Sequence, residues 1–277
     1  MNFLARRETA VALLLGAFFC APVLQPATAE TKPTCKVPND ITRLDRPLTR
    51  IGLKLQAHEA VKIIAIGSSS TAGAGASSPS ASYPARLEAD LKTRFPGTDI
   101  TVINRGVNGE IAPQMLARFD TEVIPEKPDL VLWQVGSNSV LREDPINPTA
   151  DVIRDGVKRL RAAGVDVVLI NLQYSQKILA KRDFEGMVHL IDVAAKELNV
   201  NVFRRFSVMQ HWHVTRELPF DTFVTADGIH MNDWGYDCWA KLLGGAVAEA
   251  STRPTASASV APALAAPVVP ASSKPAP

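Results

Sequence analysis

The stretch that decides the fold is residues 61–73, VKIIAIGSSSTAG, in which an apolar run leads into a glycine and three serines. Apart from Lys62, the run is continuously apolar and rich in β-branched side chains, which is typical of a strand buried on both faces of a sheet. Similar runs recur along the chain at Ile100–Ile103, Leu130–Val135, Val165–Ile170 and Val200–Phe203. We therefore expect five strands.

Segments with helical periodicity lie between and after these runs. Proline stands in the first turn of some of them, where a missing N–H is tolerated, and Gly164 follows another. The predicted helices are Pro84–Phe95, Pro113–Ile124, Thr149–Ala163, Gln176–Leu198 and Trp234–Ala248. This repeated strand–helix order predicts an α/β fold, a three-layer α/β/α sandwich with a mainly parallel five-stranded sheet.

The first 29 residues have the pattern of an export signal peptide. Arg6 and Arg7 precede the apolar segment Ala10–Leu24, and Ala27-Thr28-Ala29 carries small residues where a signal peptidase would cut. The apolar segment is too short to span a bilayer comfortably. We predict cleavage near Ala29, a periplasmic or secreted protein, and no stable membrane insertion after cleavage.

The rest of the chain divides by composition. Residues 251–277 are almost entirely Ala, Pro, Ser, Val and Thr, which predicts a disordered tail. Residues 30–55 are expected to be an N-terminal extension and residues 56–250 a single domain with a sizeable core. The formal charge of +2 gives no basic or acidic excess, so nothing in the composition points to nucleic acid or an anionic membrane surface.

The chain has three cysteines, of which Cys20 would leave with the signal peptide. Cys35 and Cys238 would share an oxidising compartment, where they could pair as an intramolecular disulfide. In the alternative, Cys238 is a small buried apolar residue on a helix and Cys35 is free. The sequence leaves both open.

Four short blocks of polar residues and glycines follow predicted strands or lie near the end of the domain. Because the carboxyl ends of parallel strands meet at one edge of a sheet, reactive groups are expected to collect there. The blocks are Gly67–Gly73, Asn104–Glu110, Gly136–Ser139 and Asp227–His230.

The first block does not fit the common glycine-rich motifs. A P-loop needs lysine where Ala74 stands, and a nucleophile elbow needs glycine where Thr71 stands. What remains is a serine at a strand-to-helix turn, in a segment that could present backbone N–H groups to an oxyanion.

The last block places Asp227 and His230 three residues apart. A carboxylate at this spacing can accept the ring N–H of the histidine and fix its tautomer, as a general base for acyl transfer requires. The asparagines and glycines of the second and third blocks supply neutral N–H donors suited to a developing oxyanion.

In this order, the four blocks resemble those of the SGNH/GDSL hydrolase superfamily of serine esterases and lipases. The resemblance covers the region from about Val61 to Leu243. It implies the flavodoxin-like SGNH hydrolase fold for a hydrolase domain at residues 56–250. It implies neither a cofactor nor a metal ion.

The same resemblance implies the roles of five residues. Ser69 would be the nucleophile, and Asp227 with His230 would complete a catalytic triad. The oxyanion hole would consist of the backbone N–H groups of Ser69 and Gly109 and the side-chain amide of Asn138.

Three positions depart from the usual pattern of the superfamily. Ser68 replaces the acid that commonly precedes the nucleophile, Glu110 takes the place of a common aspartate, and Ser139 takes the place of another. None of them transfers a proton or an acyl group in the implied mechanism. They raise the question of how the catalytic loops are braced, and hence of the substrate subclass.

The resemblance and the signal peptide together predict an exported serine hydrolase that cleaves carboxylic esters through an acyl-enzyme. We expect it to remove small acyl groups, such as acetyl, from an envelope or extracellular glycan, so its expected partner is an acylated carbohydrate or another small ester. A lipid esterase or thioesterase of the lysophospholipase kind is an alternative. A non-catalytic glycan-binding module is another, because fold alone does not fix function.

Two aromatic features of the sequence can each be interpreted in two ways. His211-Trp212-His213 either shapes the acyl or alcohol pocket or is an ordinary polar loop with a packed tryptophan, and it lacks the nearby carboxylate or cysteine that a metal site needs. Tyr174, just after the fourth strand, either reaches the cleft or is buried with its hydroxyl satisfied.

Overall fold

The computed structural model describes residues 33–254. The chain divides into two units, Met1–Thr34 and Cys35–Pro277, and the fold below is that of the second. The predicted signal peptide, and residues 255–277 of the predicted tail, lie outside the described residues.

One sheet of parallel strands forms the centre of the described chain, in the order β2-β1-β3-β4-β5. Its strands are β1 (Val61–Gly67), β2 (Ile100–Gly106), β3 (Leu130–Gln134), β4 (Asp166–Ile170) and β5 (Asn201–Phe203). In the register, Ile64 lies opposite Ile103 on one side and Val131 on the other. The predicted α/β fold with a five-stranded parallel sheet is confirmed.

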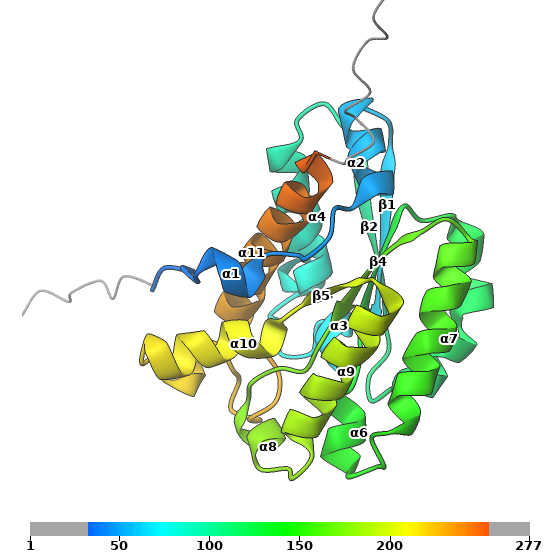
Figure 1. Cartoon of the computed structure of the whole chain (residues 1–277). Coiled ribbons are helices and arrows are strands. Elements are labelled where there is room, and N and C mark those ends of the chain that lie inside the picture. Colours follow the sequence, from blue (N-terminus) through cyan, green and yellow to red (C-terminus); the bar gives the residue numbers. More distant parts are fainter. Residues whose placement is uncertain (1–32, 255–277) are drawn as a thin grey trace, which may run out of the picture. The chain divides into compact units, whose positions relative to one another are not determined.

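Helices cover both faces of the sheet (Figure 1). Alternate residues of β1 point to opposite faces: Ile63 and Ala65 belong to one hydrophobic core, and Ile64 and Ile66 belong to the other. The first core is closed by α2 (Thr49–Gln56), α4 (Tyr83–Arg94) and α11 (Asp233–Thr252), and the second by α5 (Ala112–Ala117), α7 (Pro148–Ala162) and α9 (Phe184–Leu198).

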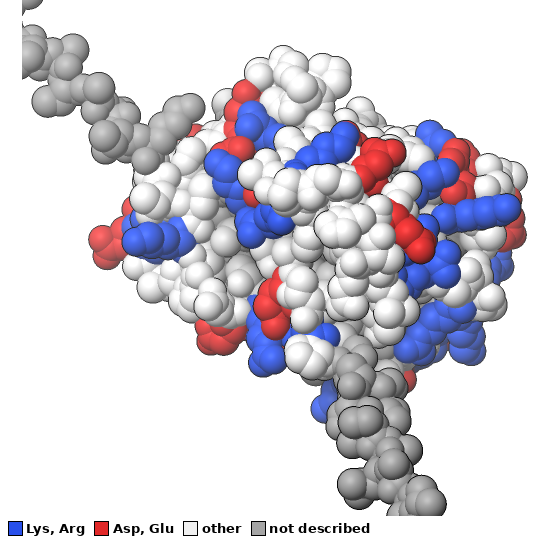
Figure 2. All heavy atoms as spheres, turned by 90° about the horizontal axis from the view of Figure 1, so that it is seen from above, with Lys and Arg blue, Asp and Glu red and all other residues white. Residues whose placement is uncertain are grey.

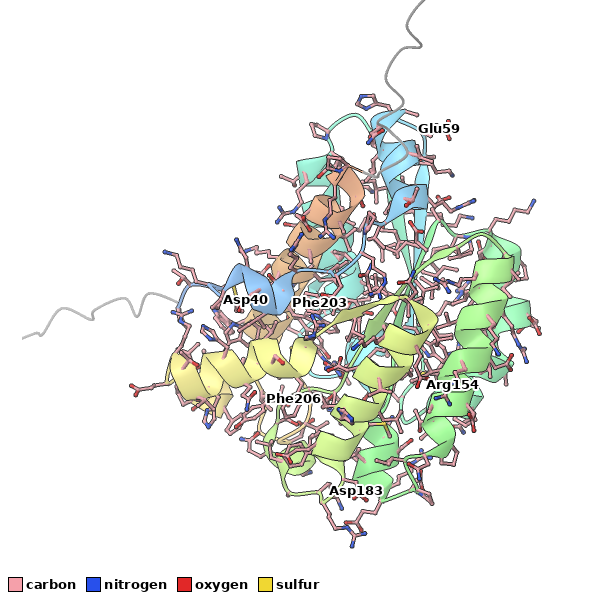
Figure 3. The ribbon with its side chains drawn as sticks, in the orientation of Figure 1. Asp40, Glu59, Arg154, Asp183, Phe203 and Phe206 are labelled. Atoms are coloured by element: carbon pink, nitrogen blue, oxygen red, sulfur yellow. A yellow bond between two sulfur atoms is a disulfide. The ribbon has the colours of Figure 1, made fainter. Side chains whose placement is uncertain are left out.

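Shorter helices and turns connect these elements. Figure 3 contrasts two environments: Arg154 of α7 is partly exposed and pairs with Glu197 of α9, whereas Phe203 at the end of β5 is fully buried. The short α-helices are α1 (Asn39–Thr42), α3 (Ser69–Ala72), α6 (Ser137–Arg142), α8 (Gln176–Leu179) and α10 (Arg205–Gln210). The 3₁₀ and π turns are η1 (Pro79–Ala81), η2 (Phe119–Val123), η3 (Ile124–Glu126), η4 (His211–Thr215) and η5 (Phe220–Thr222).

Two predicted helices are divided in the structure. The helix predicted at Pro113–Ile124 ends at Ala117 and continues as the π turn η2 and the 3₁₀ turn η3. Pro125 in η3 cannot donate a backbone hydrogen bond, so an α-helix cannot run through it. The helix predicted at Gln176–Leu198 is split into α8 and α9 by a turn at residues 180–183.

The segment before β1 packs against the first core. Leu44, Leu48 and Ile51 are at most 2% exposed. A disulfide joins Cys35 to Cys238 in α11, with their Cα atoms 5.2 Å apart. No helix of the described residues is both long and apolar enough to cross a membrane.

We expect the disulfide to contribute strongly to stability. It joins residues 203 apart, so it removes much of the loop-closure entropy of the unfolded chain, worth about 5 kcal/mol at most. Cys35→Ala should lower the free energy of unfolding in urea by about 3 to 5 kcal/mol. Reductant should shift the unfolding midpoint of the wild type but not of the variant. Equal midpoints for the oxidised and reduced wild type would contradict this prediction.

Candidate active site

The four sequence blocks lie at the carboxyl ends of the strands. Ser69 opens α3 directly after β1, and Gly109 lies in the loop after β2. Asn138 lies in α6 after β3, while Asp227 and His230 lie in the loop that leads into α11. Because β1 lies between β2 and β3, the sheet order brings the first three blocks to neighbouring positions.

Ser69, His230 and Asp227 form a continuous hydrogen-bonded chain. Ser69 Oγ lies 2.8 Å from His230 Nε2, and His230 Nδ1 lies 2.6 Å from Asp227 Oδ2. With Nδ1 donating to the carboxylate, Nε2 is left as an acceptor for the serine hydroxyl proton. This is the geometry that activates a serine as a nucleophile.

The Asp227 carboxylate also shapes its own loop. Its Oδ1 atom accepts the backbone N–H groups of Ile229 at 2.8 Å and His230 at 2.9 Å, and Gly228 takes a left-handed conformation with φ of 71°. Partial burial acts to raise the pKa of Asp227. Hydrogen bonds from the backbone and ring of His230, the Ile229 N–H and the Thr225 hydroxyl outweigh it and hold that pKa well below its usual range.

Backbone contacts fix the loop that carries the histidine. Thr225 N–H donates to the His230 carbonyl at 2.8 Å, and the Lys177 N–H of α8 donates to the Gly228 carbonyl at 3.0 Å. The Asn232 side chain accepts the Gly235 N–H at 3.0 Å and so caps α11. The loop is therefore held between α8 and the start of α11.

The serine loop is braced by side chains from β3 and α11. Ser68, which is 2% exposed, donates both its N–H and its hydroxyl to Gln134 Oε1, at 3.0 and 3.1 Å. The Tyr236 hydroxyl donates to the Ala74 carbonyl at 2.7 Å. Ser69 is the first residue of α3, where the helix itself does not use the backbone N–H. Gln134 thus provides a brace at the position where Ser68 departs from the superfamily pattern.

The side chain of Asn138 is joined to the Gly109 loop through the backbone of Glu110. Asn138 Nδ2 donates to the Glu110 carbonyl at 2.8 Å, which uses one of its two amide hydrogens. Gly109 has a φ of 78°, a conformation that favours glycine. Arg142 Nη2 donates to the Gly109 carbonyl at 2.5 Å. Two side chains of α6 therefore hold the backbone of this loop.

An ion pair supports the same loop from the other side. Arg118 Nε and Nη2 donate to the two Glu110 carboxylate oxygens, at 3.0 and 2.7 Å. Arg118 also binds the Arg105 carbonyl at 2.9 Å and the Glu122 carboxylate at 2.7 Å. The side chains of Arg118 and Glu110 are 15% and 12% exposed, so water and salt screen this bidentate pair only weakly.

A buried polar network lies beneath these loops. Ser137 donates its hydroxyl to Gln173 Oε1 at 2.7 Å, and Arg205 Nη2 donates to the same oxygen at 2.8 Å. Arg205 also donates to the Asn171 carbonyl at 3.1 Å and lies 4.9 Å from the centre of the Trp239 ring. Burial lowers the pKa of Arg205 to about 10. Gln134 at the end of β3 and Arg205 just after β5 are polar residues next to apolar strands, which was their only signal in the sequence. Arg118, at the end of α5, had no such signal.

The His211–His213 segment forms the π turn η4. Trp212 is fully buried, which supports the packed-tryptophan reading of this loop. His213 Nδ1 lies 2.9 Å from the Leu218 carbonyl, and its ring stacks on Phe220. No group of three or more His, Cys, Asp or Glu side chains that could hold a metal ion occurs within residues 33–254.

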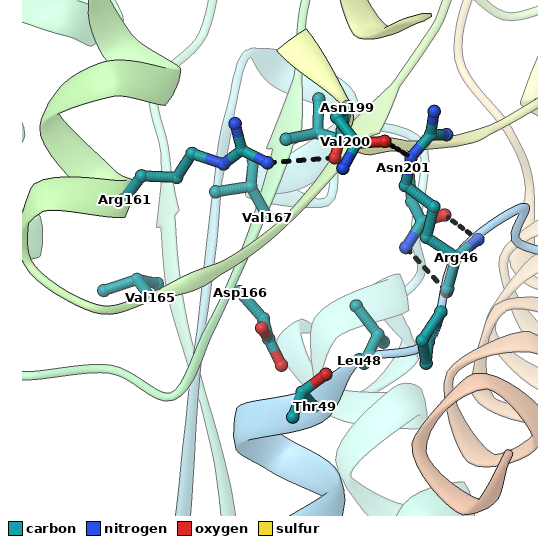
Figure 4. A pocket seen from close by; sticks show the side chains of 11 residues that line it. Arg46, Leu48, Thr49, Arg161, Val165, Asp166, Val167, Asn199, Val200 and Asn201 are labelled. Carbon is teal, nitrogen blue, oxygen red and sulfur yellow. Dashed lines mark hydrogen bonds between the residues drawn. The ribbon is translucent and has the colours of Figure 1, made fainter. Parts of the chain in front are cut away.

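A separate hollow of about 280 Å³ lies at the opposite, amino end of β4 and β5 (Figure 4). Its polar groups bind one another: Arg46 N–H donates to Asn201 Oδ1 at 2.8 Å, and Arg161 donates to the Asn199 carbonyl at 3.0 Å. We assign no catalytic role to this hollow.

Figure 2 shows that basic and acidic side chains are interspersed over the face seen from above.

Comparisons with known proteins agree with this architecture. The family model described as the non-GDSL lipase-like family matches residues 34–253. An arylesterase of Vibrio mimicus is 27% identical over 118 residues, which are 40% of this chain and 54% of the relative, so the chain spans about half of that relative. The thioesterase 1/protease 1/lysophospholipase L1 of Escherichia coli K12 is 26% identical over 195 residues, 70% of this chain and 87% of the relative.

A solved structure extends the likeness. A two-domain esterase active on acetylated mannans has a TM-score of 0.67 and 21% identity, covering 82% of this chain and 60% of its own. At this identity, the match concerns the fold.

Proposed function

The chain belongs to the non-GDSL lipase-like family and has the SGNH esterase fold, and on this premise we propose that it hydrolyses carboxylic esters with Ser69 as nucleophile. The observation that carries the proposal is the hydrogen-bonded chain from Ser69 Oγ through His230 to Asp227, at 2.8 and 2.6 Å. A serine paired in this way with an oriented histidine is set up for acyl transfer.

The first half of the reaction forms an acyl-enzyme. His230 Nε2 takes the hydroxyl proton as Ser69 Oγ attacks the ester carbonyl carbon, and Asp227 stabilises the imidazolium that results. The tetrahedral intermediate then expels the alcohol, which takes the proton from His230. The acyl group remains on Ser69.

The second half returns the enzyme. Water gives a proton to His230 and attacks the acyl carbonyl, and the carboxylic acid leaves as Ser69 regains its proton. The Ser69 and Gly109 N–H groups and the free amide hydrogen of Asn138 would bind the oxyanion in both halves. Such donors act on charge that develops only in the transition state.

We propose small acyl groups on a glycan as the natural substrate. The solved esterase active on acetylated mannans supports this choice, and the signal-peptide pattern at residues 1–29 supports a site of action in the periplasm or outside the cell. The Cys35–Cys238 disulfide fits an oxidising compartment.

The experiment that tests this proposal measures acetate release from acetylated xylan and mannan, alongside a chain-length series of aryl esters. We expect acetate release and a preference for acetyl over longer acyl groups. The E. coli relative is named in part as a lysophospholipase, so a lipid esterase is the second candidate. A steady rise in kcat/KM with chain length would favour it, since each buried methylene adds about 0.8 kcal/mol.

The Glu110–Arg118 pair is expected to position the oxyanion donors. Glu110→Gln keeps the size of the side chain but removes the charge that Arg118 binds, so the Gly109 and Asn138 donors should drift from the oxyanion. We expect kcat to fall about 10- to 100-fold with KM nearly unchanged, because small displacements of catalytic groups are costly.

Glu122→Gln is the matched control for this variant. Glu122 binds the same arginine, but its side chain is 41% exposed and does not touch the Gly109 loop. The control should keep wild-type kcat, and Arg118→Lys should lose activity as Glu110→Gln does. The Glu110–Arg118 pair has no positioning role if Glu110→Gln and Glu122→Gln lower kcat to the same extent. The same conclusion follows if Glu110→Gln changes only the melting temperature.

A further inference from the structure

Three aromatic rings from separate segments meet beside the catalytic loop. They are Tyr174 after β4, His213 in η4 and Phe220 in η5, and we call them the aromatic cluster. The His213 and Phe220 ring centres are 4.0 Å apart with planes 27° from parallel, and the Tyr174 and Phe220 centres are 5.9 Å apart with planes 16° from parallel. All three side chains are only partly buried.

Buried neighbours hold these rings in place. Phe206, labelled in Figure 3, packs edge-on against Tyr174 with ring centres 5.2 Å apart, and Phe223 lies 5.6 Å from Phe220. The bond between His213 Nδ1 and the Leu218 carbonyl fixes the histidine ring. The cluster is therefore organised before any ligand binds, which lowers the entropic cost of binding.

Hydrogen bonds connect the cluster to the catalytic loop from two sides. Asn232, two residues after His230, donates its amide to the Asp221 and Thr222 carbonyls, at 2.9 and 3.1 Å, directly after Phe220. On the other side, the Lys177 N–H donates to the Gly228 carbonyl at 3.0 Å, three residues after Tyr174. The segments that carry Tyr174 and Phe220 thus both adjoin the Asp227–His230 loop.

The cluster has the chemistry to bind a sugar, which is a ring that carries many hydroxyl groups. Aromatic faces take the apolar C–H face of a pyranose, and a phenol or imidazole can exchange hydrogen bonds with its hydroxyls. Within the described residues, the Tyr174 hydroxyl and His213 Nε2 have no hydrogen-bond partner. A hydrocarbon chain would leave both polar atoms unpaired, which costs free energy.

We propose that the aromatic cluster is a subsite for a sugar ring of an acylated glycan, adjacent to the residue whose ester Ser69 attacks. This inference rests on the proposed esterase function. In this proposal, Tyr174, His213 and Phe220 are the residues that make the enzyme prefer a glycan substrate to a lipid substrate.

The test uses paired substitutions at Phe220 in the full chain. Phe220→Tyr keeps an aromatic face, whereas Phe220→Leu keeps apolar bulk without one. We measure kcat and KM on an acetylated xylo- or mannooligosaccharide and on an aryl acetate. The ratio of kcat/KM for oligosaccharide to that for aryl acetate should fall about 10-fold in Phe220→Leu, through KM, and recover in Phe220→Tyr.

Phe95→Ala is the control, since Phe95 is a partly buried phenylalanine just after α4, near the amino end of the sheet, and should leave the ratio unchanged. A ratio unchanged in Phe220→Leu overturns the subsite. So does a larger loss on long-chain esters than on oligosaccharides, which would assign the rings to a lipid.

A separate binding measurement distinguishes failure of the subsite from failure of the esterase proposal. Unacetylated xylohexaose and mannohexaose are titrated into the wild type and Phe220→Leu by calorimetry. Weaker binding of either sugar to the variant supports the subsite even if the wild type hydrolyses no ester. Equal binding of both sugars, or binding of neither, overturns it.

Discussion

Replacing Ser69 by alanine should reduce kcat for every ester substrate by about 10⁶-fold, leaving only what the oxyanion donors and substrate binding supply. Ser69 Oγ is the atom that the His230 ring faces at 2.8 Å, and no other serine of the 68–70 run makes that contact. Ser68 is engaged with Gln134. The change removes one small side-chain oxygen, so the fold should persist.

The measurement is acetate release together with labelling by a fluorophosphonate. In the wild type, intact mass should rise by one label, and peptide mapping should locate it on Ser69. The matched control is Ser70→Ala, which should keep activity within about threefold. If a folded wild-type sample takes no label, a non-catalytic glycan-binding module becomes the better account of this fold.

Replacing Asp227 by asparagine should reduce kcat by about 10⁴-fold. Its Oδ1 atom already accepts the Ile229 and His230 N–H groups, so the amide oxygen of asparagine must take that position. The amide nitrogen then faces His230 Nδ1, where it can only donate. The ring is driven into the tautomer that carries its proton on Nε2, which cannot accept the proton of Ser69.

The same variant should fold normally, because the backbone hydrogen bonds of the loop are kept. Because the hydrogen bonds that lower the pKa of Asp227 stabilise its charged form in the folded state, we expect a somewhat lower melting temperature and an almost unchanged KM. Asp221→Asn is a control in the neighbouring turn, where the backbone carbonyl makes the contact with Asn232 and the change leaves it intact. Retention of a tenth or more of wild-type activity in Asp227→Asn would show that another group orients the histidine.

The sequence predicted the sheet well because each strand is dominated by apolar, mostly β-branched residues. The run at Leu130–Val135, for example, differs from β3 by a single residue. The split between α8 and α9 was missed because neither glycine nor proline marks it. The contact between Lys177 and Gly228, which ties α8 to the catalytic loop, joins residues far apart in the sequence.

At the site, the sequence predicted the family but not the residues that brace the loops. The family suggested by the four blocks is confirmed by the family match, while the catalytic roles of Ser69, Gly109, Asn138, Asp227 and His230 stay predictions. The bracing residues were not found, because local pattern carries no information about which distant side chain will accept a hydrogen bond. Gln134 lies inside the predicted strand Leu130–Val135, and its contact with Ser68 depends on the pairing of β1 with β3.

The separation of Ser69 from His230 has a consequence for the newly made chain. The two residues lie 161 positions apart, and the nucleophile is synthesised first. A nascent chain that ends before residue 227 contains the serine and the candidate oxyanion donors but no base to activate the hydroxyl. Ester cleavage should therefore begin only when synthesis is nearly complete. A measurement of esterase activity would then detect full-length chains but not chains that end before residue 227.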